Sequence, residues 1–179
     1  MITLVIGGCR SGKSRFALTA ANAVSGRRKI FLATSVPRDQ EMTDRVQAHQ
    51  AERGNNWITV EEPENIHACI SAHADTADVI LVDCLTLWLS NMMAAHMADK
   101  EIETRLEKTA QACFDASCPV FLVSNEVGSG IVPENPLARK FRDLAGHMNQ
   151  FMADAADRVV LAVAGQALQI KPGGNRILP

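Results

Sequence analysis

The chain has 179 residues, of which 47% are hydrophobic and 21% charged, and its formal net charge is -2 at pH 7. The length favours one domain with a sizeable core, over residues 1–179 with 172–179 as a loose tail. The charge balance argues against a general nucleic-acid binder, which would carry a basic surplus. The five cysteines show no C-x-x-C spacing, and no apolar run is long enough to span a bilayer. We therefore expect a cytoplasmic protein without a disulfide framework or a zinc site.

Short apolar runs alternate along the chain with longer segments of helical character. The expected strands are residues 2–6, 29–34, 57–61, 79–83, 120–124, 158–164 and, as a terminal edge strand, 167–171. The expected helices are residues 13–24, 39–53, 64–74, 86–98, 100–116 and 136–156. Most of the runs are rich in Val, Ile and Leu without polar alternation, as in strands covered on both faces. The pattern predicts an α/β fold, an open and mostly parallel sheet with helices on both faces.

The first expected strand leads directly into GGCRSGKS at residues 7–14, a full G-x-x-x-x-G-K-S phosphate-binding motif. Its glycines let backbone N–H groups turn toward phosphate oxygens, and the following helix adds its positive end. Lys13 is expected to reach the β- and γ-phosphates, and the Ser14 hydroxyl to bind Mg²⁺. The fold is therefore expected to be P-loop NTPase-like. The residues expected to contact nucleotide here are Gly7, Gly8, Cys9, Arg10, Ser11, Gly12, Lys13 and Ser14.

The expected helix 39–53 carries Arg45, His49 and Arg53 at intervals of four residues, which places them along one helical face. Neighbouring cations disfavour an imidazolium, so His49 would stay neutral and nucleophilic, as a histidine that attacks phosphorus must be. The competing interpretation is an exposed helix of mixed charge with an incidental histidine. From the spacing alone, that competing interpretation is favoured.

The run VILVD ends in Asp83, the arrangement of a Walker B strand, and places this carboxylate near the expected Mg²⁺. The chain has no N-K-x-D sequence. The residues that follow Asp83 do not complete a D-x-x-G motif either, so the sequence argues against a GTPase switch. The next segment, LTLWLSNMMAAHM at residues 85–97, is apolar nearly all round. Such a helix is either deeply buried or packed on another subunit, and the sequence leaves both open.

A polar loop with two glycines follows the strand at 120–124 and leads into a helix with arginines. Loops beyond the carboxyl ends of strands build ligand sites in α/β sheets. Asn125, Glu126 and Glu134 are therefore candidate contacts of substrate or nucleotide. Arg139 and Arg142 are candidates for stabilising a transferring phosphoryl group. A structured loop followed by a solvated basic helix face explains the same residues.

Taken together, these motifs resemble one family. The blocks GGCRSGKS, ATS (33–35), EMTDRVQAHQAER, WITVEEP (57–63), VILVDCLTLW and NEVGSGIVPENPLARKFRDLAG occur in this order. They resemble the bifunctional adenosylcobinamide kinase / adenosylcobinamide-phosphate guanylyltransferase family of cobalamin biosynthesis, from the first strand to about Gly165. The block NEVGSGIVPENPLAR is the most specific of them. Cys9 departs from the small residue, commonly alanine, that family members carry there.

The resemblance implies two reactions. A nucleoside triphosphate, GTP or ATP, phosphorylates adenosylcobinamide, and GMP is then transferred from GTP to adenosylcobinamide phosphate with release of pyrophosphate. It implies that His49 becomes guanylylated, that Mg²⁺ is required and that the enzyme is a homotrimer. The nucleotide-site residues that it adds to the phosphate loop are Thr34, Ser35, Arg53, Glu61 or Glu62, and Asp83. Two alternatives stay open: a single-function P-loop small-molecule kinase, and a non-catalytic nucleotide-binding protein.

Overall fold

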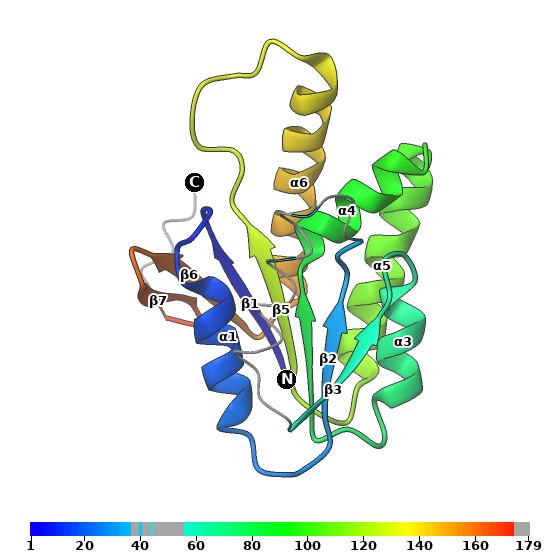
Figure 1. Ribbon diagram of the computed structural model, residues 1–179, viewed down its shortest axis with the longest axis vertical. Helices are drawn as coiled ribbons and strands as arrows, with labels where there is room; N and C mark the ends of the chain where they lie inside the picture. The colour runs from blue at the N-terminus through cyan, green and yellow to red at the C-terminus, as the bar shows by residue number, and fades with distance from the viewer. Residues whose placement is uncertain (37–39, 41–43, 45–55, 174–179) are drawn as a thin grey trace.

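The computed structural model describes residues 1–36, 40, 44 and 56–173. Within this described part, the strands form one seven-stranded sheet in the order β3-β2-β4-β5-β1-β6-β7 (Figure 1). The strands pair in parallel, except that β7 runs antiparallel to β6. Their bounds are β1 (Ile2–Gly7), β2 (Lys29–Ala33), β3 (Trp57–Glu61), β4 (Val79–Asp83), β5 (Val120–Asn125), β6 (Arg158–Val163) and β7 (Gln166–Lys171).

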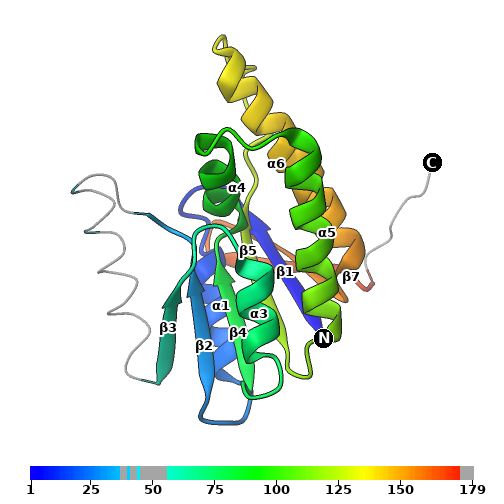
Figure 2. The ribbon, with the colours of Figure 1, turned by 90° about the vertical axis from the view of Figure 1, so that its right-hand side faces the viewer.

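Helices cover both faces of the sheet (Figure 1 and Figure 2). On one face lies α1 (Lys13–Asn22), which packs on β4, β5 and β1. On the other face lie α3 (Ile66–His73), α4 (Leu85–Ala94), α5 (Asp99–Asp115) and α6 (Pro136–Ala155). The predicted open α/β sheet with helices on both faces is thus confirmed.

Each central strand divides its side chains between two apolar clusters, because successive residues of a strand point to opposite faces. In β5, Val120 and Leu122 pack with the cluster under α4, α5 and α6, whereas Phe121 and Val123 pack with the cluster under α1. These β5 side chains are all 3% exposed or less, so the strand is buried on both faces. Double burial explains why its sequence is apolar without alternation.

The predicted strands are all present, with bounds within one residue of the expected ones. The residue range 166–171 forms the terminal edge strand β7, and the tight turn at Ala164 and Gly165 makes it antiparallel. The expected helix 39–53 lies almost wholly outside the described residues, as do residues 174–179 of the expected tail.

The apolar segment 85–97 packs against the rest of the chain. Helix α4 ends at Ala94, earlier than expected, and Leu85, Trp88, Leu89 and Met92 are completely buried against the rest of the chain. The residues of α4 that are fully exposed, Ser90 and Ala94, are small. Of the two interpretations that the sequence left open, burial within one chain therefore accounts for the apolar character of this helix.

Candidate nucleotide-binding site

Three strands end side by side at one edge of the sheet. Strand β1 ends at Gly7, β4 at Asp83, and β5, which lies between them, at Asn125. The register pairs Gly7 with Asn125 and Asp83 with Val123. Residues 8–12 leave β1 at this edge and enter α1 (Figure 1). The predicted phosphate loop thus lies beyond the carboxyl ends of the strands, where open α/β sheets bind their ligands.

The two outer glycines of the motif are required by the close packing of the loop. A Cβ on Gly7 would collide with the carbonyl oxygen of Ala162 and with Ser11 Oγ. Gly12, which caps α1, has φ +96°, in the left-handed region that favours glycine, and its carbonyl accepts the Phe16 N–H at 2.9 Å. The Ser11 carbonyl accepts the Gly165 N–H at 2.9 Å, which ties the loop to the β6–β7 turn. The loop is therefore held in shape by its own chain.

The motif lysine is turned into the loop. Lys13 is only 8% exposed, and its Nζ donates to the Gly8 carbonyl oxygen at 3.1 Å. The neighbouring Ser11 Oγ is buried and has no hydrogen-bond partner among the described residues. Ser14, one residue further on α1, is half-buried. An interior ammonium beside an uncommitted hydroxyl, at the start of a helix, is a donor set that fits a polyphosphate.

Asp83 is half-buried at the end of β4. Strand β5 lies between β4 and β1, the strand that leads into the phosphate loop. Its chain neighbour Cys84 is buried, and burial together with the Asp83 charge raises the pKa of this thiol to about 12. The Cys84 thiol therefore stays protonated at neutral pH, and the role of Asp83 in holding Mg²⁺ stays a prediction.

Thr34 and Ser35 follow β2 at the same edge, but Thr34 is completely buried. Its hydroxyl donates to the Cys84 carbonyl oxygen at 2.7 Å and accepts the Cys84 N–H at 2.8 Å. The Thr34 hydroxyl thus fixes the junction between β4 and α4 both as a donor and as an acceptor, and the contact of Thr34 with nucleotide stays a prediction. Ser35, which is half-buried, is the residue of this pair that remains open to a ligand.

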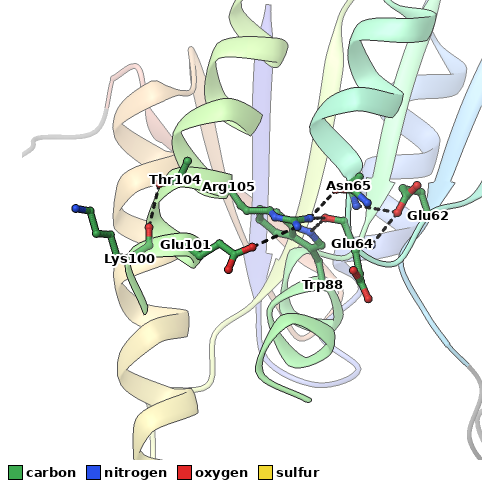
Figure 3. Close-up of polar contacts among 8 residues, drawn as sticks. All are labelled: Glu62, Glu64, Asn65, Trp88, Lys100, Glu101, Thr104 and Arg105. Carbon is green, nitrogen blue, oxygen red and sulfur yellow. Dashed lines mark hydrogen bonds and ion pairs between the residues drawn. The ribbon is translucent and has the colours of Figure 1, made fainter. Parts of the chain in front are cut away.

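Glu61 and Glu62, which the sequence could not separate, differ in the structure. One carboxylate oxygen of Glu62 accepts the N–H groups of Glu64 at 2.9 Å and Asn65 at 2.7 Å (Figure 3). Glu62 thereby satisfies backbone donors at the start of α3. Glu61 ends β3 and is exposed. Glu61 is thus the more exposed of the two carboxylates, and which of them contacts a nucleotide stays a prediction.

The loop that follows Glu62 is fixed to α4 and α5 (Figure 3). Trp88 Nε1 donates to the Glu64 carbonyl oxygen at 2.7 Å, and the Arg105 guanidinium donates to the same oxygen at 3.1 Å and to Asn65 Oδ1 at 2.7 Å. Asn91, also on α4, donates to the carbonyl oxygens of Thr34 and Pro63. These contacts hold the ends of β2 and β3 together, and no short sequence pattern indicated them.

The candidate residues after β5 have separate roles. The Glu126 carboxylate accepts the Gly128 N–H, and Arg139 donates to the carbonyl oxygens of Pro133 and Glu134. Both side chains therefore stabilise their own connection, which rises to the top of the view in Figure 1. Glu134 is exposed, and Arg142 is half-buried beside a hollow of about 370 Å³ between this connection and α6. The two bonds of Arg139 use Nη1 alone, so a charge-stabilising role for this exposed guanidinium stays a prediction.

A buried polar network below Asn125 was also not indicated by the sequence. The Asn125 N–H donates to Thr86 Oγ1 at 2.7 Å, and Asn149 Nδ2 donates to the Asn125 carbonyl oxygen at 3.0 Å. Ser124 Oγ donates to Asn149 Oδ1 at 2.6 Å and lies 3.3 Å from Thr86 Oγ1. The network fixes the end of β5 to α4 and α6. A Thr, a Ser and an Asn at otherwise apolar positions were its only signal.

His49 and Arg53, the predicted nucleophile and its neighbouring cation, lie outside the described residues. So does Arg45. Their places in the site stay predictions.

The arrangement defines a P-loop nucleotide-binding protein, and solved structures share the fold. A RadB recombinase structure matches with a TM-score of 0.55 and 16% identity, over 89% of this chain and 73% of that chain. The flagellar accessory protein FlaH from Methanocaldococcus jannaschii matches with a TM-score of 0.53 and 11% identity, over 97% of this chain and 80% of that chain. At these identities the likeness concerns the fold.

The sequence comparisons identify the family. Residues 3–170 match the family described as cobinamide kinase / cobinamide phosphate guanyltransferase. The bifunctional adenosylcobalamin biosynthesis protein CobU is 38% identical in Escherichia coli K12 and 39% identical in Salmonella typhimurium LT2, over 96% of this chain and 100% of each relative. The corresponding protein CobP of Pseudomonas aeruginosa is 37% identical over 96% of this chain and 98% of its own length. The chain therefore belongs to the cobinamide kinase / cobinamide phosphate guanyltransferase family, as the sequence motifs predicted.

Proposed function

We propose that this protein phosphorylates adenosylcobinamide with a nucleoside triphosphate and then transfers GMP from GTP to the product, giving adenosylcobinamide-GDP and pyrophosphate. The observation that carries the proposal is the complete phosphate loop at the sheet edge of a chain that matches the family over residues 3–170. The match covers nearly the whole length of bifunctional relatives.

In the kinase step, the aminopropanol hydroxyl oxygen attacks the γ-phosphorus and the nucleoside diphosphate leaves. Backbone N–H groups of residues 8–12 and the start of α1 hold the phosphates, and Lys13 moves from the Gly8 carbonyl oxygen to the β- and γ-phosphates. Ser14 and Asp83 would hold Mg²⁺, because a hydroxyl and a carboxylate are the oxygen ligands that this ion takes alongside nucleotide phosphates. When bound, the ion would supply charge neutralisation for the phosphates.

In the guanylyl transfer step, we propose His49 as the nucleophile. Its neutral imidazole nitrogen attacks the α-phosphorus of GTP and expels pyrophosphate, which forms a phosphoramidate bond. The phosphate of adenosylcobinamide phosphate then attacks the same phosphorus and releases the histidine. Family resemblance and the flanking Arg45 and Arg53 support this assignment, since two cations favour the neutral imidazole. The two displacements predict ping-pong kinetics for this step.

Ser35, Glu61 and Arg53 are proposed as the nucleotide contacts outside the phosphate loop. The engaged side chains of Thr34 and Glu62 support the backbone that carries these contacts. We also propose a homotrimer, in keeping with the family resemblance. The exposed apolar residues Ile131, Val132 and Leu137 offer a surface for subunit contact that α4 does not.

We place the reactions in the cytoplasm. All five cysteines are free thiols, as is usual in a reducing compartment. In the described part of the chain, no helix combines the length and apolar character that a membrane span needs.

A single-function kinase is the competing assignment, since it would use the same loop, Lys13 and Asp83. One incubation separates the two. The protein is mixed with α-labelled GTP, Mg²⁺ and adenosylcobinamide, and both protein and products are analysed. The proposal expects label in adenosylcobinamide-GDP. Formation of adenosylcobinamide phosphate without any labelled corrinoid would establish the single-function kinase instead.

A further inference from the structure

We propose that Asn125 is a catalytic residue of the kinase step, whose side-chain amide donates a hydrogen bond to the γ-phosphoryl group as it is transferred. The inference deepens the proposed function and rests on it. It begins with the position of Asn125 at the end of β5, the strand that separates the phosphate-loop strand from the Asp83 strand.

The face on which Asn125 lies follows from the alternation of β5. Ser124 bonds to Thr86 of α4 and Asn149 of α6, so its side chain lies on the face covered by these helices. Phe121 and Val123 pack on the opposite face with α1. Asn125, two residues beyond Val123, continues that opposite face. Its side chain is therefore on the side of the sheet where Lys13 begins α1.

The two neighbours of Asn125 at the sheet edge lie on this same face. In β1, Val5 packs with α1, and Gly7 follows two residues later. In β4, Val79 and Leu81 pack with α1, and Asp83 follows two residues later. Gly7, Asn125 and Asp83 consequently all lie on the α1 face, on three adjacent strands with β5 in the middle; Gly7 is level with Asn125, whereas Asp83 is level with Val123, two residues earlier on β5.

The end of β5, the middle strand of the three, is where a γ-phosphate belongs. In a phosphate loop the backbone N–H groups hold the α- and β-phosphates, and the lysine reaches the β- and γ-phosphates. A Walker B carboxylate marks the far side, because it would hold the Mg²⁺ ion that offsets the charge of the phosphates. The γ-phosphoryl group thus lies between the loop and Asp83, over the end of β5.

The backbone of Asn125 is fixed while its side chain is available. Its N–H and carbonyl groups are both taken, by Thr86 Oγ1 at 2.7 Å and by Asn149 Nδ2 at 3.0 Å. The next N–H, of Glu126, donates to the Gly7 carbonyl oxygen at 3.0 Å and joins this strand end to the phosphate loop. The side-chain amide makes no hydrogen bond to another residue in the described part of the chain, and Asn125 is half-buried. A buried network thus holds in place an amide that is open to solvent and therefore available to a ligand.

The chemistry assigns the amide a donor role. As the substrate hydroxyl oxygen forms its bond to the γ-phosphorus, the bond from that phosphorus to the β–γ bridging oxygen breaks, and the hydroxyl proton passes to solvent. In the transition state, negative charge is spread over the equatorial oxygens of the transferring phosphoryl group. A fixed N–H donor stabilises this charge without reorganising. In guanylyl transfer the reacting atom is the α-phosphorus, which is held at the loop, so the same donor contributes less.

The test compares Asn125→Ala and Asn125→Asp with wild type in both half-reactions. Asn125→Ala is expected to lower kcat of the kinase step by about 100-fold, as loss of an oxyanion donor does, and kcat of guanylyl transfer by less than about 5-fold. Asn125→Asp keeps the shape but presents a carboxylate to phosphate, so its kinase kcat should fall below that of the alanine variant. Gln111→Ala, which removes an exposed amide on α5, is the matched control and should keep both rates.

A purely structural role for Asn125 predicts the opposite order. The isosteric aspartate would then be the milder variant, and both half-reactions would decline together; either result overturns the inference. If the first variants fail to fold, Asn125→Ser, which carries a shorter donor, is used instead. The measured quantity is the ratio of its affinity for nucleoside triphosphate to its affinity for nucleoside diphosphate. A ratio below that of wild type supports a γ-phosphate contact, and an unchanged ratio contradicts it. If wild type itself makes no adenosylcobinamide phosphate, the proposed function fails before the inference is reached.

Discussion

Replacing Asn149 by alanine tests how much the buried network at the end of β5 contributes to the free energy of unfolding. Asn149 is 7% exposed, and its amide joins Ser124 Oγ at 2.6 Å to the Asn125 carbonyl oxygen at 3.0 Å. The alanine variant loses two buried hydrogen bonds and leaves the Asn125 carbonyl group without its donor. Each buried group so affected costs about 1–2 kcal/mol, which gives about 2–4 kcal/mol of unfolding free energy in total.

For a chain of this length, each kcal/mol corresponds to about 2–4 °C in Tm, so the expected fall is roughly 4–16 °C. Differential scanning calorimetry of Asn149→Ala, wild type and Gln150→Ala measures it; Gln150 is exposed on the same helix and its variant should stay within about 1 °C. The kinase activity of Asn149→Ala should fall by a larger factor than guanylyl transfer, because Asn149 holds the backbone that positions the Asn125 amide. A Tm within 2 °C of wild type would refute the view that this network holds β5 to α4 and α6.

Three further predictions concern the phosphate loop, the cysteines and the assembly. Lys13→Ala should lower both half-reactions by about 100-fold or more, because one loop serves both steps; near-normal rates for either would contradict this. Iodoacetamide at pH 8 should label the exposed Cys9 and spare Cys84 and Cys113, since burial raises the pKa of the latter two thiols to about 12. GTP with Mg²⁺ should protect Cys9 from labelling. Mass spectrometry identifies the labelled cysteines. Light scattering should give three times the 19.4 kDa chain mass, and a stable monomer would exclude the trimer.

The sheet and the phosphate loop were predictable because each has a local signature. Doubly buried strands such as β5 leave an uninterrupted apolar run, and the loop from Gly7 to Ser14 combines glycines with a lysine at fixed spacing. The antiparallel direction of β7 was harder to predict from the sequence, because it depends on the turn at Ala164 and Gly165.

The roles of individual polar residues were less predictable, because they depend on contacts between distant segments. Thr34 and Cys84 are joined across 50 residues, and Arg105 reaches Asn65 across 40 residues. The sequence alone therefore could not show that the Thr34 hydroxyl is engaged. The apolar segment 85–97 raised the possibility of a subunit contact for the same reason: its covering helices come from elsewhere in the chain.

Covalent labelling by α-labelled GTP tests the central claim, that one chain performs guanylyl transfer through His49 in addition to the kinase step. Wild type and His49→Ala are incubated with α-labelled GTP and Mg²⁺, denatured, and divided between acid and base. A phosphoramidate survives base and breaks in acid, so wild type should keep its label in base alone, and adenosylcobinamide phosphate added before denaturation should remove the label as adenosylcobinamide-GDP. His49→Ala should carry no label while still phosphorylating adenosylcobinamide. Acid-stable label on wild type, or label that persists on His49→Ala, would place the nucleophile elsewhere and contradict the account.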